Sequence, residues 1–147
     1  MFRRILVAFD GSEQSKRAFD RAIDLAACFN SELYGLTVFE DAPPSVSVPG
    51  YGPAESEEPV RSAEMADLDR MSYLDEAPAR ALAKGVRIEL MSAEGEAADA
   101  IIAAVNDLKC DLLVFGLRRH RGLFDSLLSH TASTLEEQSP CSIVGVR

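Results

Sequence analysis

Two short segments carry side chains that can bind a small molecule. Asp10 follows the apolar run ILVAF of residues 5–9, and the basic segment RRHR of residues 118–121 follows a second apolar run, DLLVFG. A carboxylate accepts hydrogen bonds from hydroxyl and amino groups, whereas guanidinium groups suit phosphate oxygens. Ser126, Ser129 and Thr131, near the start of a following helix, would add hydroxyl donors. The two segments together indicate a site for a ligand with an anionic part.

Each segment also has a simpler interpretation. Asp and Gly favour a tight strand-to-helix turn without any ligand, as Asp10-Gly11-Ser12 would form. The basic residues of segment 118–121 can pair with surplus acids of the same chain, because charged runs on a surface are usually solvated or paired. The sequence leaves both alternatives open.

Catalytic and metal-binding chemistry is not indicated. The chain has two histidines, His120 and His130, and neither has a neighbour that marks a catalytic triad or a metal-ligand pattern. The three cysteines form no CxxC pair, so neither a disulfide framework nor a zinc site is expected. We therefore expect no catalytic residue, no metal and no required cofactor.

Composition limits the classes of partner. The length of 147 residues and the apolar content of 47% predict one folded domain, residues 1–147. The formal net charge of −9 disfavours binding to nucleic acid and to anionic membranes. No apolar run approaches the length of a signal peptide core or a membrane span, so we expect a cytoplasmic protein.

The pattern of apolar residues predicts that strands and helices alternate along this domain. Short apolar runs predict strands at 5–9, 33–39, 111–116 and 142–146, and alternating apolar and polar residues predict a strand at 86–91. Helical spacing predicts helices at 13–29 after a Ser12 cap, 60–84 with a kink or break at Pro78, 94–108, and 127–138. A proline-rich excursion occupies residues 41–59. This alternation predicts a parallel sheet with helices on both faces and a ligand site outside the carboxyl ends of the strands, where the strand order reverses.

Three segments carry a resemblance to a known family. The segments RRILVAFDGSEQSKRAFDRAIDLA, DLLVFGLRRHRGL and SPCSIVGV resemble the universal stress protein family over essentially the whole chain. That resemblance implies an α/β, Rossmann-like fold of the adenine nucleotide alpha hydrolase type: an open five-stranded parallel sheet in the order 3-2-1-4-5, flanked by helices. Its strand order reverses between strands one and four, where the residues alone also place the site.

The resemblance further implies which positions would meet ATP. Family members that bind ATP have the motif G-x2-G-x9-G-[S/T] after strand four. By that likeness, Asp10 matches the acid that meets adenosine, and Val38 matches the backbone position that meets adenine. Gly116 matches the first glycine of the motif, and Gly122 is a glycine often found in the same loop. The remaining three motif positions depart, because this chain has Arg119, Ser129 and His130 there.

These departures bring side chains where bare backbone would touch phosphate. We therefore expect a protein that acts without nucleotide, as one branch of the family does. The alternative is an adenine-nucleotide switch (ATP with Mg²⁺, ADP or AMP) in which Asp10 and the guanidinium groups of Arg118, Arg119 and Arg121 bind the ligand.

The closing strand suggests how such a protein would work. In the family it pairs across a two-fold axis, which implies a homodimer here. The candidate interface residues are Ser142, Ile143, Val144 and Val146. We expect a non-enzymatic stress-response dimer that binds a further, unidentified protein partner.

Overall fold

Strands and helices alternate along the chain in the computed structural model, which describes residues 1–39, 58–117 and 129–147. The strands are β1 (Arg4–Ala8), β2 (Glu32–Phe39), β3 (Ile88–Glu94), β4 (Leu112–Gly116) and β5 (Ser142–Val146). The helices are α1 (Glu13–Phe29), α2 (Glu58–Ala83), α3 (Ala97–Leu108) and α4 (Ser129–Gln138). The proline-rich excursion predicted for residues 41–59 lies almost entirely outside the described residues.

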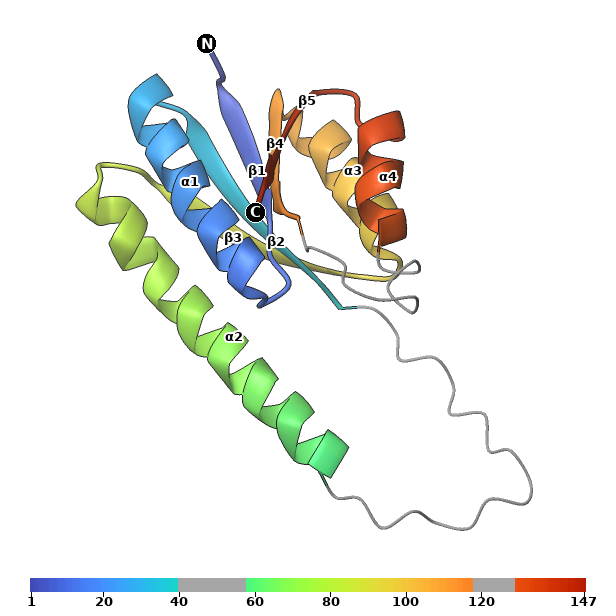
Figure 1. The fold of residues 1–147 in the computed structure, drawn as a ribbon. Coiled ribbons are helices and arrows are strands. Elements are labelled where there is room, and N and C mark those ends of the chain that lie inside the picture. Colours follow the sequence, from blue (N-terminus) through green and yellow to red (C-terminus); the bar gives the residue numbers. More distant parts are fainter. Residues whose placement is uncertain (40–57, 118–128) are drawn as a thin grey trace.

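The five strands form one parallel sheet in the order β3-β2-β1-β4-β5, as expected (Figure 1). The order reverses between β1 and β4, which pair from Ile5 with Leu112 to Ala8 with Phe115. Helices α1 and α2 cover one face, and α3 and α4 cover the other (Figure 1). The central strand is therefore buried on both sides, which explains its uninterrupted apolar run.

Three helices end in the same left-handed turn. Asn30, Gly85 and Lys109 have φ angles of 54°, 74° and 53°, and the residue after each donates a backbone hydrogen bond back to the last turn of its helix. Val86, for example, donates to the carbonyl of Ala81 at 2.9 Å. Val86 thus belongs to the turn, and β3 starts at Ile88 rather than at residue 86. At its other end β3 extends to Glu94, so α3 begins at Ala97 rather than at residue 94.

Pro78 does not divide α2, which runs from Glu58 to Ala83 as one helix. Proline costs the helix one backbone hydrogen bond, to the carbonyl of Leu74. The flanking residues Ala77 and Ala81 are fully buried against α1 and the sheet, and this packing stabilises the helix across the missing bond.

Tyr73 attaches α2 to the rest of the fold. Its ring stacks on Phe9 with centroids 5.0 Å apart and meets Phe19 edge-on at 5.8 Å. Its hydroxyl donates to the backbone carbonyl of Lys16 in α1 at 3.0 Å. The Arg80 guanidinium lies 3.8 Å from the ring centroid and carries a cation–π contact. One side chain therefore joins α2 both to α1 and to the end of β1.

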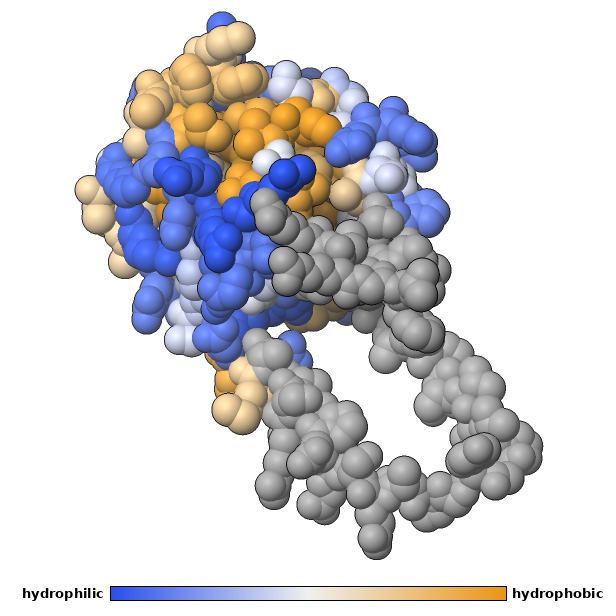
Figure 2. All heavy atoms as spheres, viewed as in Figure 1, coloured by the Kyte–Doolittle hydropathy of each residue, from blue (hydrophilic) through white to orange (hydrophobic). Residues whose placement is uncertain are grey.

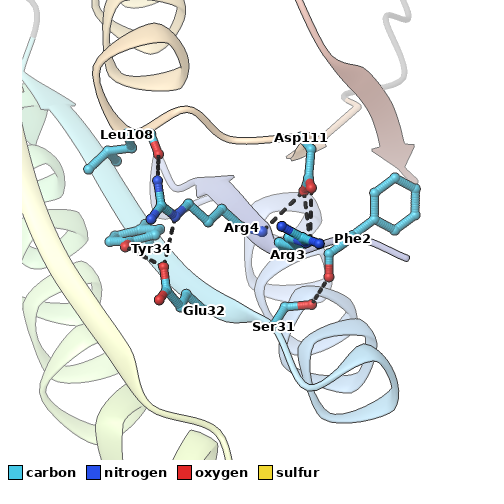
Figure 3. Close-up of polar contacts among 8 residues, drawn as sticks. All are labelled: Phe2, Arg3, Arg4, Ser31, Glu32, Tyr34, Leu108 and Asp111. Carbon is cyan, nitrogen blue, oxygen red and sulfur yellow. Dashed lines mark hydrogen bonds and ion pairs between the residues drawn. The ribbon is translucent and has the colours of Figure 1, made fainter.

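A polar network fastens the amino ends of the strands, at the opposite edge from the predicted site (Figure 3). The Asp111 carboxylate accepts hydrogen bonds from the backbone N–H groups of Arg3 and Arg4 at 2.9–3.1 Å. The Arg4 side chain donates to Glu32 at 2.9 Å and to the Leu108 carbonyl at 3.0 Å. A hollow opens on this network, but Arg4, Glu32 and Asp111 in its lining already bond within the protein, so the network serves the fold.

Cys110, just before β4, is buried, and burial raises the pKa of its thiol to about 11. Because the unfolded thiol ionises at a lower pH, the stabilisation is complete below about pH 8.5 and is lost as pH rises towards the folded pKa. We expect the free energy of unfolding to fall by about 2 kcal/mol more in the wild type than in Cys110→Ala between about pH 8 and pH 10.5. Urea unfolding at both pH values measures this difference. Cys28→Ala, at an exposed site, is the control and should behave like the wild type.

Candidate functional site

The turn from β1 to α1 places Asp10 at the edge where the strand order reverses. Asp10 is exposed, and one oxygen of its carboxylate accepts the backbone N–H of Ser12 at 2.9 Å. Gly11 between them has a φ of 85°, which favours glycine. Ser12 then caps α1 by accepting the N–H of Ser15 at 3.1 Å. The segment therefore forms the strand-to-helix turn that its residues favour, and this turn holds the Asp10 carboxyl group at the carboxyl end of β1.

The ends of β1 and β2 diverge next to Asp10. The hydrogen bond from the Phe9 N–H to the Leu36 carbonyl, at 2.8 Å, is the last backbone bond between these segments among the described residues. Successive peptide groups alternate between the two edges of a strand, so the N–H and C=O of Val38 face the same edge as the Leu36 carbonyl. That edge is the opening between β1 and β2. Val38 thus presents one backbone donor and one acceptor beside the turn that holds Asp10.

Gly116, at the end of β4, has a packing role that the motif comparison did not reveal. A Cβ atom at this position would lie 2.6 Å from the backbone carbon of Gln14 and 2.6 Å from the nitrogen of Ser15. Only a glycine lets β4 approach the first turn of α1 this closely. The position is therefore fixed by the fold, whatever ligand binds.

The basic candidates Arg118, Arg119 and Arg121, together with Gly122, lie outside the described residues. Ser129 is the first residue of α4. His130 is exposed in the same turn, and its Nδ1 lies 2.9 Å from the Thr134 hydroxyl. Thr131 is half-buried. The structure therefore describes the Asp10 and Val38 side of the candidate site and the start of α4.

Two residues that the sequence analysis did not select also lie at this edge. Phe39, the last residue of β2, is 48% exposed. Arg70 of α2 has its guanidinium 5.3 Å from the Phe39 ring centroid. A Cβ atom added at Gly11 would lie 3.3 Å from the Arg70 Cβ, so the Arg70 side chain passes along the β1–α1 turn. An exposed aromatic residue at a strand end was the available signal for Phe39, whereas no local pattern marks Arg70.

The fifth strand forms an edge of the sheet among the described residues, with β4 as its one neighbour. Val144 is 36% exposed and Ser142 is exposed, while Ile143 and Val146 are half-buried against the two core clusters. Figure 2 shows an apolar patch over this strand. The four predicted interface residues therefore lie together on one strand, partly accessible.

Neither a metal centre nor a membrane span is found in the part of the chain that the structure describes. No three His, Cys, Asp or Glu side chains in residues 1–39, 58–117 and 129–147 gather where they could hold a metal ion. Within the same ranges, no helix has the length and apolar character needed to cross a membrane.

The strand order and the reversal between β1 and β4 define an open, parallel α/β protein, a class in which ligands bind where the strand order reverses. The model of the universal stress protein family matches residues 1–147, and the chain belongs to that family. The resemblance inferred from the three sequence segments is thereby confirmed.

Individual relatives agree with this assignment. The universal stress protein YxiE of Bacillus subtilis is 31% identical, over the full length of both chains. A universal stress protein of Thermus aquaticus is 29% identical, again over the full length of both. The stress response protein NhaX of Bacillus subtilis is 28% identical over 98% of this chain and 97% of that protein. The chain is thus similar to stress-response proteins along its whole length.

Solved structures support the same fold. The crystal structure of a universal stress protein in complex with cAMP matches with a TM-score of 0.69 and 26% identity, covering 99% of this chain and 97% of the other. UspA of Lactobacillus plantarum matches with a TM-score of 0.70 at 20% identity, over 99% and 97% of the two chains. A universal stress protein of Archaeoglobus fulgidus in complex with dAMP matches with a TM-score of 0.60 at 17% identity, over 99% and 98%. The latter two likenesses concern the fold.

Proposed function

We propose that this chain is a non-enzymatic stress-response module that works as a homodimer and binds an adenine nucleotide at the carboxyl ends of β1 and β2. The observation that carries the nucleotide site is the divergence of β1 and β2, which turns the Val38 backbone towards the opening. The Val38 N–H and C=O suit the edge of adenine, which has a ring-nitrogen acceptor next to an amino donor. Asp10, at the adjoining turn, can accept ribose hydroxyl groups.

The 26% identical relative in complex with cAMP supports this proposal over the expectation that the protein acts without nucleotide. It also favours a mononucleotide over ATP. In the motif of the ATP-binding members, positions 119 and 129 are glycine and position 130 is serine or threonine, which lets the backbone touch a triphosphate. This chain has Arg119, Ser129 and His130 at those positions. Arg118 and Arg121 are then suited to a single phosphate group.

Thermal unfolding with added nucleotide tests the site. A ligand present at 100 times its dissociation constant stabilises a protein by about 2.7 kcal/mol. We expect AMP and cAMP to raise the unfolding temperature by several degrees, and ATP with Mg²⁺ to raise it less. Asp10→Ala should remove most of the shift. If no adenine ligand stabilises the wild type at millimolar concentration, the nucleotide part of the proposal is wrong.

A specific feature also favours the homodimer. An edge strand with unpaired backbone groups pairs readily with a second copy, and β5 adds partly exposed apolar side chains to that edge. Two copies related by a two-fold axis would place the same strand against itself, antiparallel, and extend the sheet from one subunit into the other. Such a dimer would leave the carboxyl ends of β1 and β2 uncovered in each subunit, because β5 lies two strands away from β1.

A charge in the middle of β5 tests the dimer. Val144→Asp would bring two carboxylates together at the two-fold axis, so we expect the light-scattering mass to fall from that of a dimer to that of a monomer. Leu82→Asp is the matched control, because Leu82 is 69% exposed on α2, away from β5, and this variant should stay dimeric. A wild-type mass of one chain, or a Val144→Asp variant that stays dimeric, would rule out this interface.

A further inference from the structure

The end of β2 presents an exposed aromatic ring beside the proposed adenine position. Phe39 directly follows Val38, and its ring is 48% exposed. Side chains alternate between the faces of a strand. Val38 packs in the core cluster under α3 and α4, so Phe39 points to the face covered by α1 and α2. Phe39 therefore stands above the plane of the sheet at the place where the Val38 backbone faces the opening.

Arg70 reaches the same place from α2. Its guanidinium lies 5.3 Å from the Phe39 ring centroid, and its aliphatic stem runs along Gly11. The neighbouring Asp69 pairs with Lys16 at 2.6 Å, and no carboxylate among the described residues forms an ion pair with Arg70.

We propose that Phe39 and Arg70 form a stacking platform for the purine base of the bound nucleotide. This inference rests on the adenine site proposed above. A base whose edge bonds to the Val38 backbone continues the plane of the sheet, so one of its flat faces turns towards α1 and α2. That face meets the Phe39–Arg70 pair. Aromatic rings and the planar guanidinium group both stack on nucleobases, and Gly11 leaves room for the Arg70 stem.

The platform makes a specific prediction about which part of the ligand is recognised. A stacking contact acts on the base, so its loss weakens adenosine and AMP by the same factor. A guanidinium that paired with phosphate would instead act on AMP alone. Lysine at position 70 keeps the positive charge but not the plane, and leucine at position 39 keeps the apolar volume but not the aromatic face.

Isothermal titration of adenosine and AMP into the wild type, Phe39→Leu, Arg70→Lys and the double variant tests this. We expect each single variant to weaken both ligands by about 10-fold, the size of one base-stacking contact. The double variant should lose little more than either single variant, because the two side chains act as one platform. Arg21→Lys, on the exposed face of α1, is the control and should bind like the wild type.

The outcomes separate the two proposals. If the wild type binds neither adenosine nor AMP, the adenine site itself is wrong, and the platform with it. If the wild type binds both and the two single variants bind equally well, the platform alone is overturned. A loss confined to AMP would also overturn it, in favour of phosphate pairing. Unfolding temperatures of the unliganded variants, expected within about 2 °C of the wild type, show that each variant is folded.

Discussion

Gly116→Ala is expected to lower the free energy of unfolding by about 3 kcal/mol, at the upper end of the usual cost of overpacking a core. The added Cβ would lie 2.6 Å from backbone atoms of Gln14 and Ser15, closer than such atoms approach in folded proteins. Backbone cannot rotate away as a side chain can, so either the end of β4 or the first turn of α1 must shift. For a chain of this size the loss lowers the unfolding temperature by about 10 °C.

The measurement is urea unfolding of the wild type and the variant without any nucleotide. Gly85→Asn is the matched control: a Cβ there meets nothing within 4 Å, and asparagine adopts the left-handed conformation of that turn. The control should change the free energy of unfolding by less than about 1 kcal/mol. A Gly116→Ala variant as stable as the wild type would show that the glycine is free of packing constraint.

Local signals in the sequence predicted the alternation of strands and helices, whereas the order of the sheet was implied by the resemblance to the universal stress protein family. The central strands β1 and β4 are short apolar runs, and α1 has one apolar face formed by Ala18, Phe19, Ala22, Ile23 and Ala26. The errors lie at element ends. Val86 is apolar and buried, but it serves the turn after α2 rather than β3, and only the backbone bond to Ala81 shows this.

The candidate site was predictable to the extent that topology defines it. Asp10 follows from the rule that ligands bind beyond the carboxyl ends of strands where the order reverses, whereas Val38 was selected by its match to a backbone position of the family. Arg70 was not predictable, because it lies 31 positions after Phe39 on a helix in which acids surround it, as on any solvated face. Its contact with Phe39 depends on how α2 packs on the rest of the fold, and a single tertiary contact of this kind produces no periodic pattern in the sequence.

This dependence links the stability of α2 to the proposed site. Arg70 lies three positions before Tyr73, about one helical turn, so any movement of this part of α2 carries the guanidinium away from Phe39. N-terminal to Arg70, Met65 and Leu68 are exposed, and Asp69 pairs with Lys16 at the surface. We expect the aromatic contacts of Tyr73 to be the main attachment of this part of α2, and thus to fix the position of Arg70.

Tyr73→Ala is therefore expected to lower the free energy of unfolding by about 3 kcal/mol and to loosen α2. The variant loses the stacking on Phe9 and the edge contact with Phe19, whose ring centroids lie 5.0 Å and 5.8 Å away. It also loses the cation–π contact with the Arg80 guanidinium, 3.8 Å from the ring centroid. Tyr73→Phe keeps the ring and loses the hydroxyl contacts with the Lys16 carbonyl and the Asp20 carboxylate, so it should lose about 1 kcal/mol. Urea unfolding of the two variants gives both values.

Hydrogen exchange identifies where the loss falls. In Tyr73→Ala the backbone amides of α2 should exchange at least 10-fold faster, while those of β1 and β4 change only in step with global stability. Leu82→Ala is the control on the same helix, because Leu82 is 69% exposed and its loss should cost less than about 0.5 kcal/mol. Equal protection of α2 in Tyr73→Ala and Tyr73→Phe would mean that the ring does not hold the helix. Arg70 would then owe its position beside Phe39 to other contacts.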